Sequence, residues 1–288
     1  MPVNKTRIPY IEFYITNVCN LACAGCNRFN NYYFKGFQKW QDYAGIYQSW
    51  SQRLKFGSIA ILGGEPMLNP DFLQWVDGIT ALWPDTHTRI ISNGFRLPYN
   101  KLLYQRLIGN KNLSLWVGIH NKQHKKTIID NIKEFTVAPH TVVFNTENPY
   151  QQFLTITDKN GVKIIAEYNW WFHQGSIVVD NNQLSLHQSD VKKAHTICHM
   201  KTCHHFVRGK LYKCGVVAVL PEFTQQHKLN LSPADHKLLH SYKPLEITDS
   251  DQEVQTFVDN LKNPIDQCKF CPEQYNGNQI WSQLKNHV

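Results

Sequence analysis

The sequence predicts an α/β protein in which a curled parallel sheet is followed by a small cysteine-rich region. Strand and helix patterns alternate along the first two-thirds of the chain, and such alternation is typical of parallel strands joined by right-handed crossovers. From about residue 185 the alternation ends, and five of the eight cysteines lie beyond that point. We therefore expect two domains, residues 1–185 and residues 186–288.

The expected strands are short runs of apolar, aromatic and β-branched residues. The first of them alternates in polarity and is rich in aromatic residues, and the second ends at a pair of glycines. The six strands are Pro9–Thr16, Ser58–Leu62, Thr88–Ile91, Leu113–Ile119, Thr141–Phe144 and Val162–Tyr168.

Helices are expected between these strands, where apolar residues recur every three or four positions. The segments are Gln38–Leu54, a helix that starts at Pro70, Tyr99–Ile108 and the basic segment Lys122–Phe135. Tyr150–Thr157 fits neither a helix nor a strand clearly, so the last connection stays open.

The cysteine-rich region has its own expected elements. Phe206–Tyr212 resembles a tight hairpin centred on Arg-Gly, and helices are expected at Pro233–His240 and Asp251–Lys262. Ser250 and Glu253 have the spacing of a capping box for the second of these helices.

Three cysteines near the start, Cys19, Cys23 and Cys26, carry most of the functional information. Their spacing is C-x3-C-x2-C, and three thiolates on one loop can bind three corners of a cubic iron–sulfur cluster. The fourth iron then has an open position for a substrate or cosubstrate. The alternative is a structural zinc site, which needs a fourth ligand. Residues 27–50 contain neither Cys nor His, so that ligand would have to come from the C-terminal cysteines.

Two further motifs extend this pattern: Gly63-Gly64-Glu65-Pro66 after the second strand and Ser92-Asn93-Gly94 after the third. With them the chain resembles the radical S-adenosylmethionine superfamily over roughly its first two-thirds. The residue before the third cysteine, usually aromatic in that family, is Gly25 here. The resemblance implies a partial (β/α)6 barrel. All three motifs follow strands, and in curled sheets of this kind the chemistry is placed at the C-terminal ends of the strands.

The resemblance also implies a reaction. S-adenosylmethionine would bind the open iron of a 4Fe–4S cluster held by the three N-terminal cysteines. Reductive cleavage would yield methionine and a 5′-deoxyadenosyl radical, which abstracts hydrogen from an unactivated C–H bond of a substrate that the sequence does not identify. Sugar or other small-molecule dehydrogenation and peptide modification are the two outcomes considered.

The motif residues have expected roles in binding the cosubstrate. Glu65 would accept the methionine ammonium, and Gly63 and Gly64 would let the backbone approach closely. Ser92 and Asn93 would bond to the ribose or the carboxylate.

We also expect two residues at strand ends to reach the pocket that binds the cosubstrate. They are His120 after the fourth strand and Asn145 after the fifth.

A second group of cysteines resembles the shortened auxiliary-cluster domain (Twitch, a truncated SPASM domain) of some radical S-adenosylmethionine enzymes. It implies an auxiliary 4Fe–4S cluster bound by four cysteines and leaves Cys203 as a candidate hydrogen-atom donor. The alternatives are that Cys203 is a ligand in place of Cys198, or that it is an inert core thiol. Because histidines lie close to these cysteines in the sequence, a zinc site in place of the iron–sulfur cluster is a further alternative. The four implied ligands are Cys198, Cys214, Cys268 and Cys271.

Composition bounds location and partners. Hydrophobic content of 42% and charged content of 18% are those of a globular protein, and no stretch is long enough to span a bilayer. We expect a cytoplasmic protein with reduced thiols, which takes electrons from a donor such as flavodoxin or ferredoxin. The net charge of +8 favours anionic partners. A nucleic-acid-binding protein with purely structural clusters is therefore the alternative function.

Overall fold

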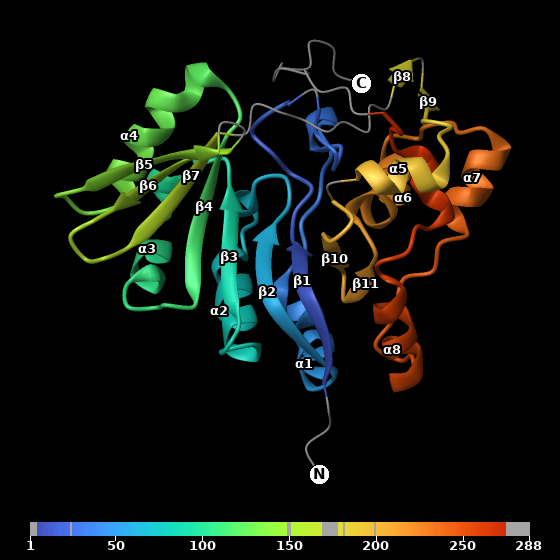
Figure 1. The fold of residues 1–288 in the computed structure, drawn as a ribbon, viewed down its shortest axis with the longest axis horizontal. Helices are drawn as coiled ribbons and strands as arrows, with labels where there is room; N and C mark the ends of the chain where they lie inside the picture. Colours follow the sequence, from blue (N-terminus) through green and yellow to red (C-terminus); the bar gives the residue numbers. More distant parts are fainter. Residues whose placement is uncertain are drawn as a thin grey trace.

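The computed structural model describes residues 5–23, 25–148, 151–168, 178–180, 182–198 and 200–274. A nine-stranded sheet forms its centre (Figure 1). Along the chain its strands are β1 (Thr6–Tyr14), β2 (Leu54–Leu62), β3 (His87–Ser92), β4 (Leu113–Ile119), β5 (Thr141–Asn148), β6 (Gln151–Thr157), β7 (Lys163–Tyr168), β10 (His204–Val207) and β11 (Lys210–Tyr212). Their order across the sheet is β11-β10-β1-β2-β3-β4-β7-β6-β5. The strands from β10 to β7 in that order are parallel. A separate hairpin joins β8 (Val178–Asp180) and β9 (Gln183–Ser185).

Helices from the first half of the chain pack against one face of this sheet. Their apolar residues share a buried core with strand residues such as Ile11, Phe13 and Leu115. Alternate strand residues point to the opposite face, so that face is free to carry polar side chains. The helices of the first half are α1 (Trp40–Arg53), α2 (Phe72–Leu82), α3 (Lys101–Leu107) and α4 (Lys125–Phe135). The second half has α5 (Val191–Ile197), α6 (Gly215–Gln226), α7 (Pro233–His240) and α8 (Asp251–Asn260).

The α/β class is confirmed, and the expected elements of the first four strand–helix units are present with small shifts at their ends. β4 has the predicted bounds, while β2 starts at Leu54 rather than Ser58. The expected basic helix begins with a 3₁₀ turn at Lys122–His124 before α4. Such shifts are normal for helix and strand ends.

The expected parallel arrangement of the fifth strand is wrong. β5 lies at the sheet edge and pairs antiparallel with β6, which pairs antiparallel with β7. The undecided segment Tyr150–Thr157 therefore contributes the strand Gln151–Thr157. Only two residues separate β5 from β6, and a parallel crossover needs about a dozen or more.

The C-terminal region contributes to the main sheet. β10 pairs in parallel with β1, and the β10–β11 hairpin turns at Arg208 and Gly209, whose φ angles of 50° and 74° suit a two-residue turn. The sheet thus continues across the expected boundary at residue 185. The capping box of Ser250 and Glu253 at α8 is confirmed.

A second core ties the first cysteine loop to this region. Phe223 of α6 contacts three aromatic rings of the loop that follows β1. The ring centroids lie 5.0 Å from Phe29, 5.5 Å from Tyr32 and 5.6 Å from Phe34. The loop therefore has a rigid support on its C-terminal side.

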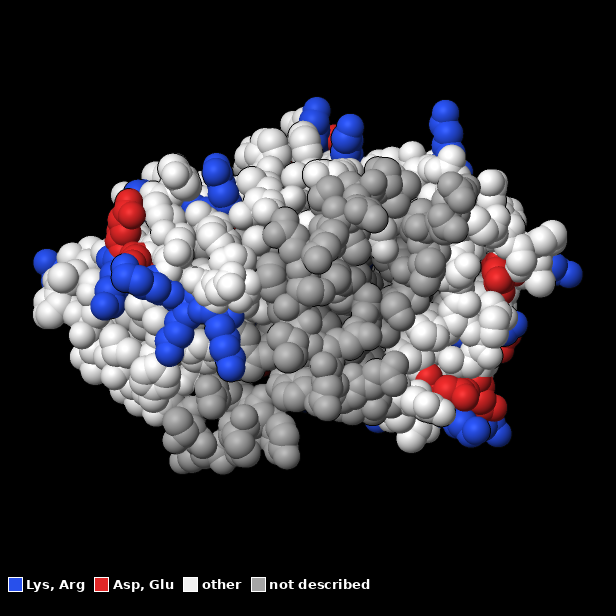
Figure 2. Space-filling model, turned by 90° about the horizontal axis from the view of Figure 1, so that it is seen from above, with Lys and Arg blue, Asp and Glu red and all other residues white. Residues whose placement is uncertain are grey.

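The surface shows no single dominant basic stripe in the view from above (Figure 2). Lys and Arg gather on the side where α4 lies and are otherwise scattered, with Asp and Glu beside several of them. In the part of the chain that the structure describes, no helix combines the length and the apolar character needed to cross a bilayer.

Candidate functional site

The loop carrying Cys19, Cys23 and Cys26 begins directly after β1 and is held in place from within. Asn30 is buried, and its amide donates to the carbonyl of Asn17 (2.7 Å) and to the hydroxyl of Tyr14 (2.8 Å). The amide N–H of Cys26 bonds to the carbonyl of Cys23 at 3.0 Å. The three cysteines are thus placed by hydrogen bonds of their own loop.

The glycine pair after β2 packs directly against this loop. The N–H of Gly64 bonds to the carbonyl of Thr16, and the N–H of Glu65 bonds to the carbonyl of Val18, both at 2.8 Å. A Cβ on Gly63 would lie 2.4 Å from the Thr16 oxygen, and one on Gly64 would lie 2.3 Å from the Val18 oxygen. The close approach that these glycines allow in this structure is to the cysteine loop, whereas the sequence argument placed it at the cosubstrate.

Glu65 joins the second motif to the third. Its carboxylate is fully buried and accepts the N–H of Asn93 (2.8 Å), the N–H of Met67 (3.2 Å) and the hydroxyl of Ser92 (3.0 Å). Burial raises the pKa of Glu65 to about 7, although these donors favour the charged form. Pro66 begins the short 3₁₀ turn that Glu65 caps.

Asn93 completes the contact between the motifs. Its side-chain amide donates to Asn20 (2.8 Å) and lies 3.9 Å from the sulfur of Cys19. All three motifs of the sequence argument therefore meet at one edge of the sheet, at the C-terminal ends of β1, β2 and β3.

The thiols of this loop fit a cluster with separate irons better than a single ion. Burial raises the pKa of Cys19 to about 12, and the nearby Cys26 and Cys23 contribute to the rise. Among the described residues, no three Cys, His, Asp or Glu side chains converge closely enough to hold one metal ion. A single zinc would need its sulfurs within roughly 4 Å of one another, because Zn–S bonds are about 2.3 Å long. In a cubic cluster each thiolate binds its own iron.

The four cysteines expected to bind the auxiliary cluster lie near one another. Each of Cys198, Cys214 and Cys271 lines an enclosed, mostly apolar cavity of about 60 Å³. Burial raises the pKa of Cys214 to about 11 and holds the pKa of Cys271 well above its usual value. The neighbouring thiols, Cys268 among them, add to both shifts. None of the eight cysteines forms a disulfide.

Cys203 has different surroundings. Its pKa is raised to about 12, mainly by burial and next by the negative charge of Glu12. The positive charge of Arg28 lowers this pKa and so opposes the shift. The thiol of Cys198 adds a smaller effect than those of burial, Glu12 and Arg28. Cys203 thus faces a charged network rather than the four-cysteine group.

That network is a feature that sequence reasoning missed. Glu12 on β1 lies 2.6 Å from a guanidinium nitrogen of Arg28 and 2.9 Å from Nε2 of His205, and it accepts the Tyr10 hydroxyl at 2.9 Å. Burial alone would raise the pKa of Glu12, but Arg28 and His205 hold it well below its usual range. The signal in the sequence was a glutamate in the middle of an otherwise apolar strand.

The two residues added at strand ends are placed differently. The ring of His120 packs beside Gly118 of its own strand, where a Cβ would lie 3.0 Å from the ring. Asn145 lies on β5, which β7 and β6 separate from β4. β5 is therefore not next to β4, and the side chain of Asn145 lies outside what the structure describes.

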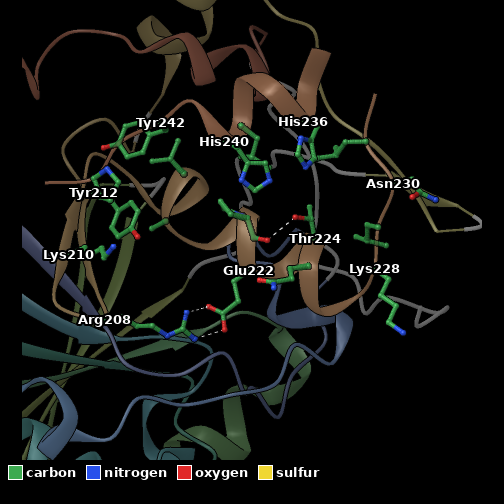
Figure 3. A pocket seen from close by; sticks show the side chains of 18 residues that line it. Arg208, Lys210, Tyr212, Glu222, Thr224, Lys228, Asn230, His236, His240 and Tyr242 are labelled. Atoms are coloured by element: carbon green, nitrogen blue, oxygen red, sulfur yellow. Dashed lines mark hydrogen bonds and ion pairs between the residues drawn. The ribbon is translucent and has the colours of Figure 1, made fainter. Parts of the chain in front are cut away.

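A groove of about 820 Å³ lies apart from all these motifs, between β11, α6 and α7 (Figure 3). Its charged side chains are largely paired: Arg208 binds Glu222 through two nitrogens, at 2.6 and 2.5 Å. The rings of His236 and His240 stand 4.4 Å apart on α7. None of the sequence-predicted site residues lines this groove.

Comparison with known proteins gives limited further information. No family model matches the chain. It is 33% identical over 90 residues to a GTP 3′,8-cyclase from Actinobacillus succinogenes. That match covers 31% of this chain and 27% of the cyclase, so the chain spans only about a quarter of that relative.

Among solved structures, the chain is similar to Streptococcus suis SuiB bound to S-adenosylmethionine, with 22% identity, a TM-score of 0.35 and coverage of 43% of this chain and 28% of SuiB. It is also similar to BtrN in complex with AdoMet and 2-DOIA, with 15% identity, a TM-score of 0.49 and coverage of 96% of this chain and 100% of BtrN.

Three observations connect the chain with a known superfamily. The first cysteine loop has the C-x3-C-x2-C spacing, and the Gly63–Pro66 and Ser92–Gly94 motifs are hydrogen-bonded to it and to each other. The cyclase match adds sequence identity over a contiguous part of the chain. On these grounds the chain resembles the radical S-adenosylmethionine superfamily.

Proposed function

We propose that this protein is a radical S-adenosylmethionine enzyme that abstracts hydrogen from an unactivated C–H bond of its substrate. The observation that carries the proposal is the chain of contacts from Cys19 through Asn93 to Glu65, because it joins three separate motifs at one site. When bound, the 4Fe–4S cluster and S-adenosylmethionine supply the reductive C–S cleavage and the radical chemistry.

The chain's own residues have binding and positioning roles in this proposal. Cys19, Cys23 and Cys26 hold the cluster and leave one iron open. Glu65 fixes the loop of Ser92 and Asn93 and is the proposed acceptor for the methionine ammonium. Because Glu65 is fully buried, an ammonium near it would interact through a low-dielectric environment, where charge attraction is strong.

The proposal is tested by anaerobic reconstitution with iron and sulfide, followed by addition of dithionite and S-adenosylmethionine. Formation of 5′-deoxyadenosine is the expected result. A variant with alanine at Cys19, Cys23 and Cys26 is the control and should form none while it keeps its other iron. Zinc in place of iron, or equal product from that variant, would contradict the proposal.

We also propose that Cys198, Cys214, Cys268 and Cys271 hold an auxiliary 4Fe–4S cluster in the region 186–288. The cavity that Cys198, Cys214 and Cys271 line, and the mutual effects of the four thiols on pKa, support this assignment. Such a cluster would accept an electron from a substrate radical or help to anchor the substrate. Iron analysis should give about eight irons per chain, against about four for the N-terminal cluster alone.

Cys203 is the proposed hydrogen-atom donor to a product radical. Its position beside Glu12 and Arg28, outside the four-cysteine group, supports a role other than that of a ligand. Cys203→Ala should keep the full iron content, whereas Cys198→Ala should lose iron. The reverse result would exchange their roles.

The substrate class and the electron donor complete the proposal. We infer a small-molecule or peptide substrate, and a donor such as flavodoxin or ferredoxin in the cytoplasm. The alternative function, binding of nucleic acid with structural clusters, predicts salt-sensitive RNA or DNA binding without cleavage of S-adenosylmethionine. In the view from above, the basic residues do not form one continuous stripe (Figure 2).

A further inference from the structure

A row of mostly polar residues crosses the face of the sheet that points away from α1–α4. The strand register places His205, Glu12, Ala60, Arg89 and Ser114 side by side on β10, β1, β2, β3 and β4. Their immediate neighbours in sequence, such as Ile11, Ile59 and Ile90, belong to the helix-covered core. Since side chains alternate along a strand, the row faces the other side.

Arg89 is the charged centre of this row. Its guanidinium lies 5.1 Å from the ring centre of Tyr10 and 5.0 Å from that of Trp116. The two rings therefore hold it by cation–π contacts. Among the residues that the structure describes, Arg89 has no hydrogen-bond acceptor and no ion pair, and its Nε is shielded from solvent.

Two more donors beside Arg89 lack partners. The Ser114 hydroxyl and the indole N–H of Trp116 are both buried atoms without a hydrogen bond to any described residue. Ser114 is directly opposite Arg89 in the register, and Trp116 follows two residues later on the same face. Buried polar groups are nearly always hydrogen-bonded, so three unpaired donors at adjacent positions indicate a missing acceptor.

The acidic groups nearby do not supply it. Glu12 is already bound by Arg28 and His205. Glu167 on β7 interacts electrostatically with Arg89 but forms no ion pair with it within 4.0 Å. The three donors are therefore left to an acceptor from outside this part of the chain.

We propose that Arg89, Ser114 and Trp116 bind an oxyanion of the substrate, a carboxylate or a phosphate. Tyr10 and Trp116 contact the guanidinium, and a guanidinium can make a two-point contact with such a group through its N–H donors. The inference rests on the proposed function, since it names the class of substrate for the same enzyme.

The position of Arg89 separates it from the strand-end motifs. Arg89 precedes Ser92 by three residues on β3. Because a strand rises about 3.3 Å per residue, the backbone of Arg89 lies roughly 10 Å from the strand end where Glu65 and Asn93 meet. The cosubstrate is expected at the strand ends. The oxyanion therefore belongs to the substrate rather than to the methionine carboxylate.

The test uses the reconstituted full-length protein without reductant, titrated calorimetrically with inorganic phosphate and, separately, with acetate. We expect Arg89→Ala to weaken binding of the preferred anion at least tenfold. Arg106→Ala is the matched control, because it removes the same charge from a partly exposed residue that is paired with Asp77. Its affinity should equal that of the wild type. Preference for phosphate or acetate identifies the kind of oxyanion.

A second variant distinguishes a loss of anion binding from a loss of folding. Trp116→Phe keeps an aromatic ring beside Arg89 but removes the N–H donor, and it should weaken binding several-fold with an unchanged melting temperature. The proposal is overturned if neither anion binds at up to about 10 mM, or if both variants bind like the wild type. Mutually exclusive binding of the anion and S-adenosylmethionine would also overturn it, because the methionine carboxylate would then be the occupant.

The outcomes for the two proposals are distinguishable. Protein that binds the anion through Arg89 but forms no 5′-deoxyadenosine with reductant would contradict the proposed function alone. Protein that forms 5′-deoxyadenosine but binds neither anion would contradict the substrate assignment alone.

Discussion

The backbone N–H of Asn93 donates a hydrogen bond of 2.8 Å to the buried carboxylate of Glu65. Twenty-eight residues separate them in sequence, and they belong to two different motifs. Because Asn93 also contacts the cysteine loop through Asn20, this carboxylate fixes the geometry of the whole site. Four predictions test how much the site depends on such buried contacts.

Glu65→Ala should destabilise the protein strongly. The N–H groups of Met67 and Asn93 would lose their acceptor in a buried place, and each such loss costs about 1–3 kcal/mol. We expect the free energy of unfolding to fall by about 2–5 kcal/mol in chemical denaturation. Glu246→Ala, which removes a half-exposed glutamate paired with Lys210, is the control and should change it by less than about 1 kcal/mol. Equal effects would contradict the role given to Glu65.

The raised pKa of Glu65 predicts a pH dependence of stability. The pKa rises from 4.5 in the unfolded chain to about 7 in the folded protein, mainly because of burial. Between these values the folded state keeps a proton that the unfolded state has released, so stability falls as pH rises through this window. The slope should be at most about 1.4 kcal/mol per pH unit, and Glu65→Gln should remove it. A variant whose profile matches that of the wild type would show that Glu65 does not titrate there.

Glu12 should give the opposite pH dependence of stability. Its pKa is depressed below the ordinary value of 4.5, so it contributes stability that is present above that pH and is lost as the pH falls below it. Glu12→Gln should flatten this acid limb and, at neutral pH, cost about 3–5 kcal/mol because Arg28 stays buried without its partner. Asp130→Asn, at an exposed pair with Lys126, should change stability by less than about 0.5 kcal/mol. Thermal and denaturant unfolding from pH 3 to 8 measures both effects.

Gly64→Ala should displace the cysteine loop. The added methyl would lie 2.3 Å from the Val18 oxygen and 3.0 Å from Cβ of Cys19, so the backbone beside Cys19 must move. We expect loss of about four of the eight irons expected per chain. Gly45→Ala on α1 is the control, since nothing lies within 4 Å of its new Cβ. Anaerobic iron and sulfide analysis of both variants decides: full iron content in Gly64→Ala would show that the loop tolerates the shift.

Much of the site could be predicted because its signals are local. The cysteine spacing, the Gly-Gly-Glu-Pro run and the turn at Arg208-Gly209 are each contained within a few residues, and backbone geometry restricts what such runs can do. The capping box of Ser250 and Glu253 was found for the same reason. The position of Glu65 between the motifs also followed, since parallel strands bring their carboxyl ends to one edge.

Other features required contacts across the chain. The sequence of β5 does not show that this strand pairs with β6 rather than with β4, because the pattern of one strand does not reveal its partner strand. The packing of Gly63 and Gly64 against the cysteine loop could not be predicted for a similar reason: two adjacent glycines indicate a close approach but not which segment approaches.

The sequence by itself determined the chemistry that we propose for this protein, since the type and spacing of Cys19, Cys23 and Cys26 restrict which metal group three neighbouring thiols can hold. Only the tertiary structure decided which residues surround that chemistry. Glu12, Arg28 and His205 come from three distant segments, and so do Tyr10, Arg89 and Trp116. Their partnership depends on strand order and register, which arise from burial of the whole sheet rather than from any local run of residues.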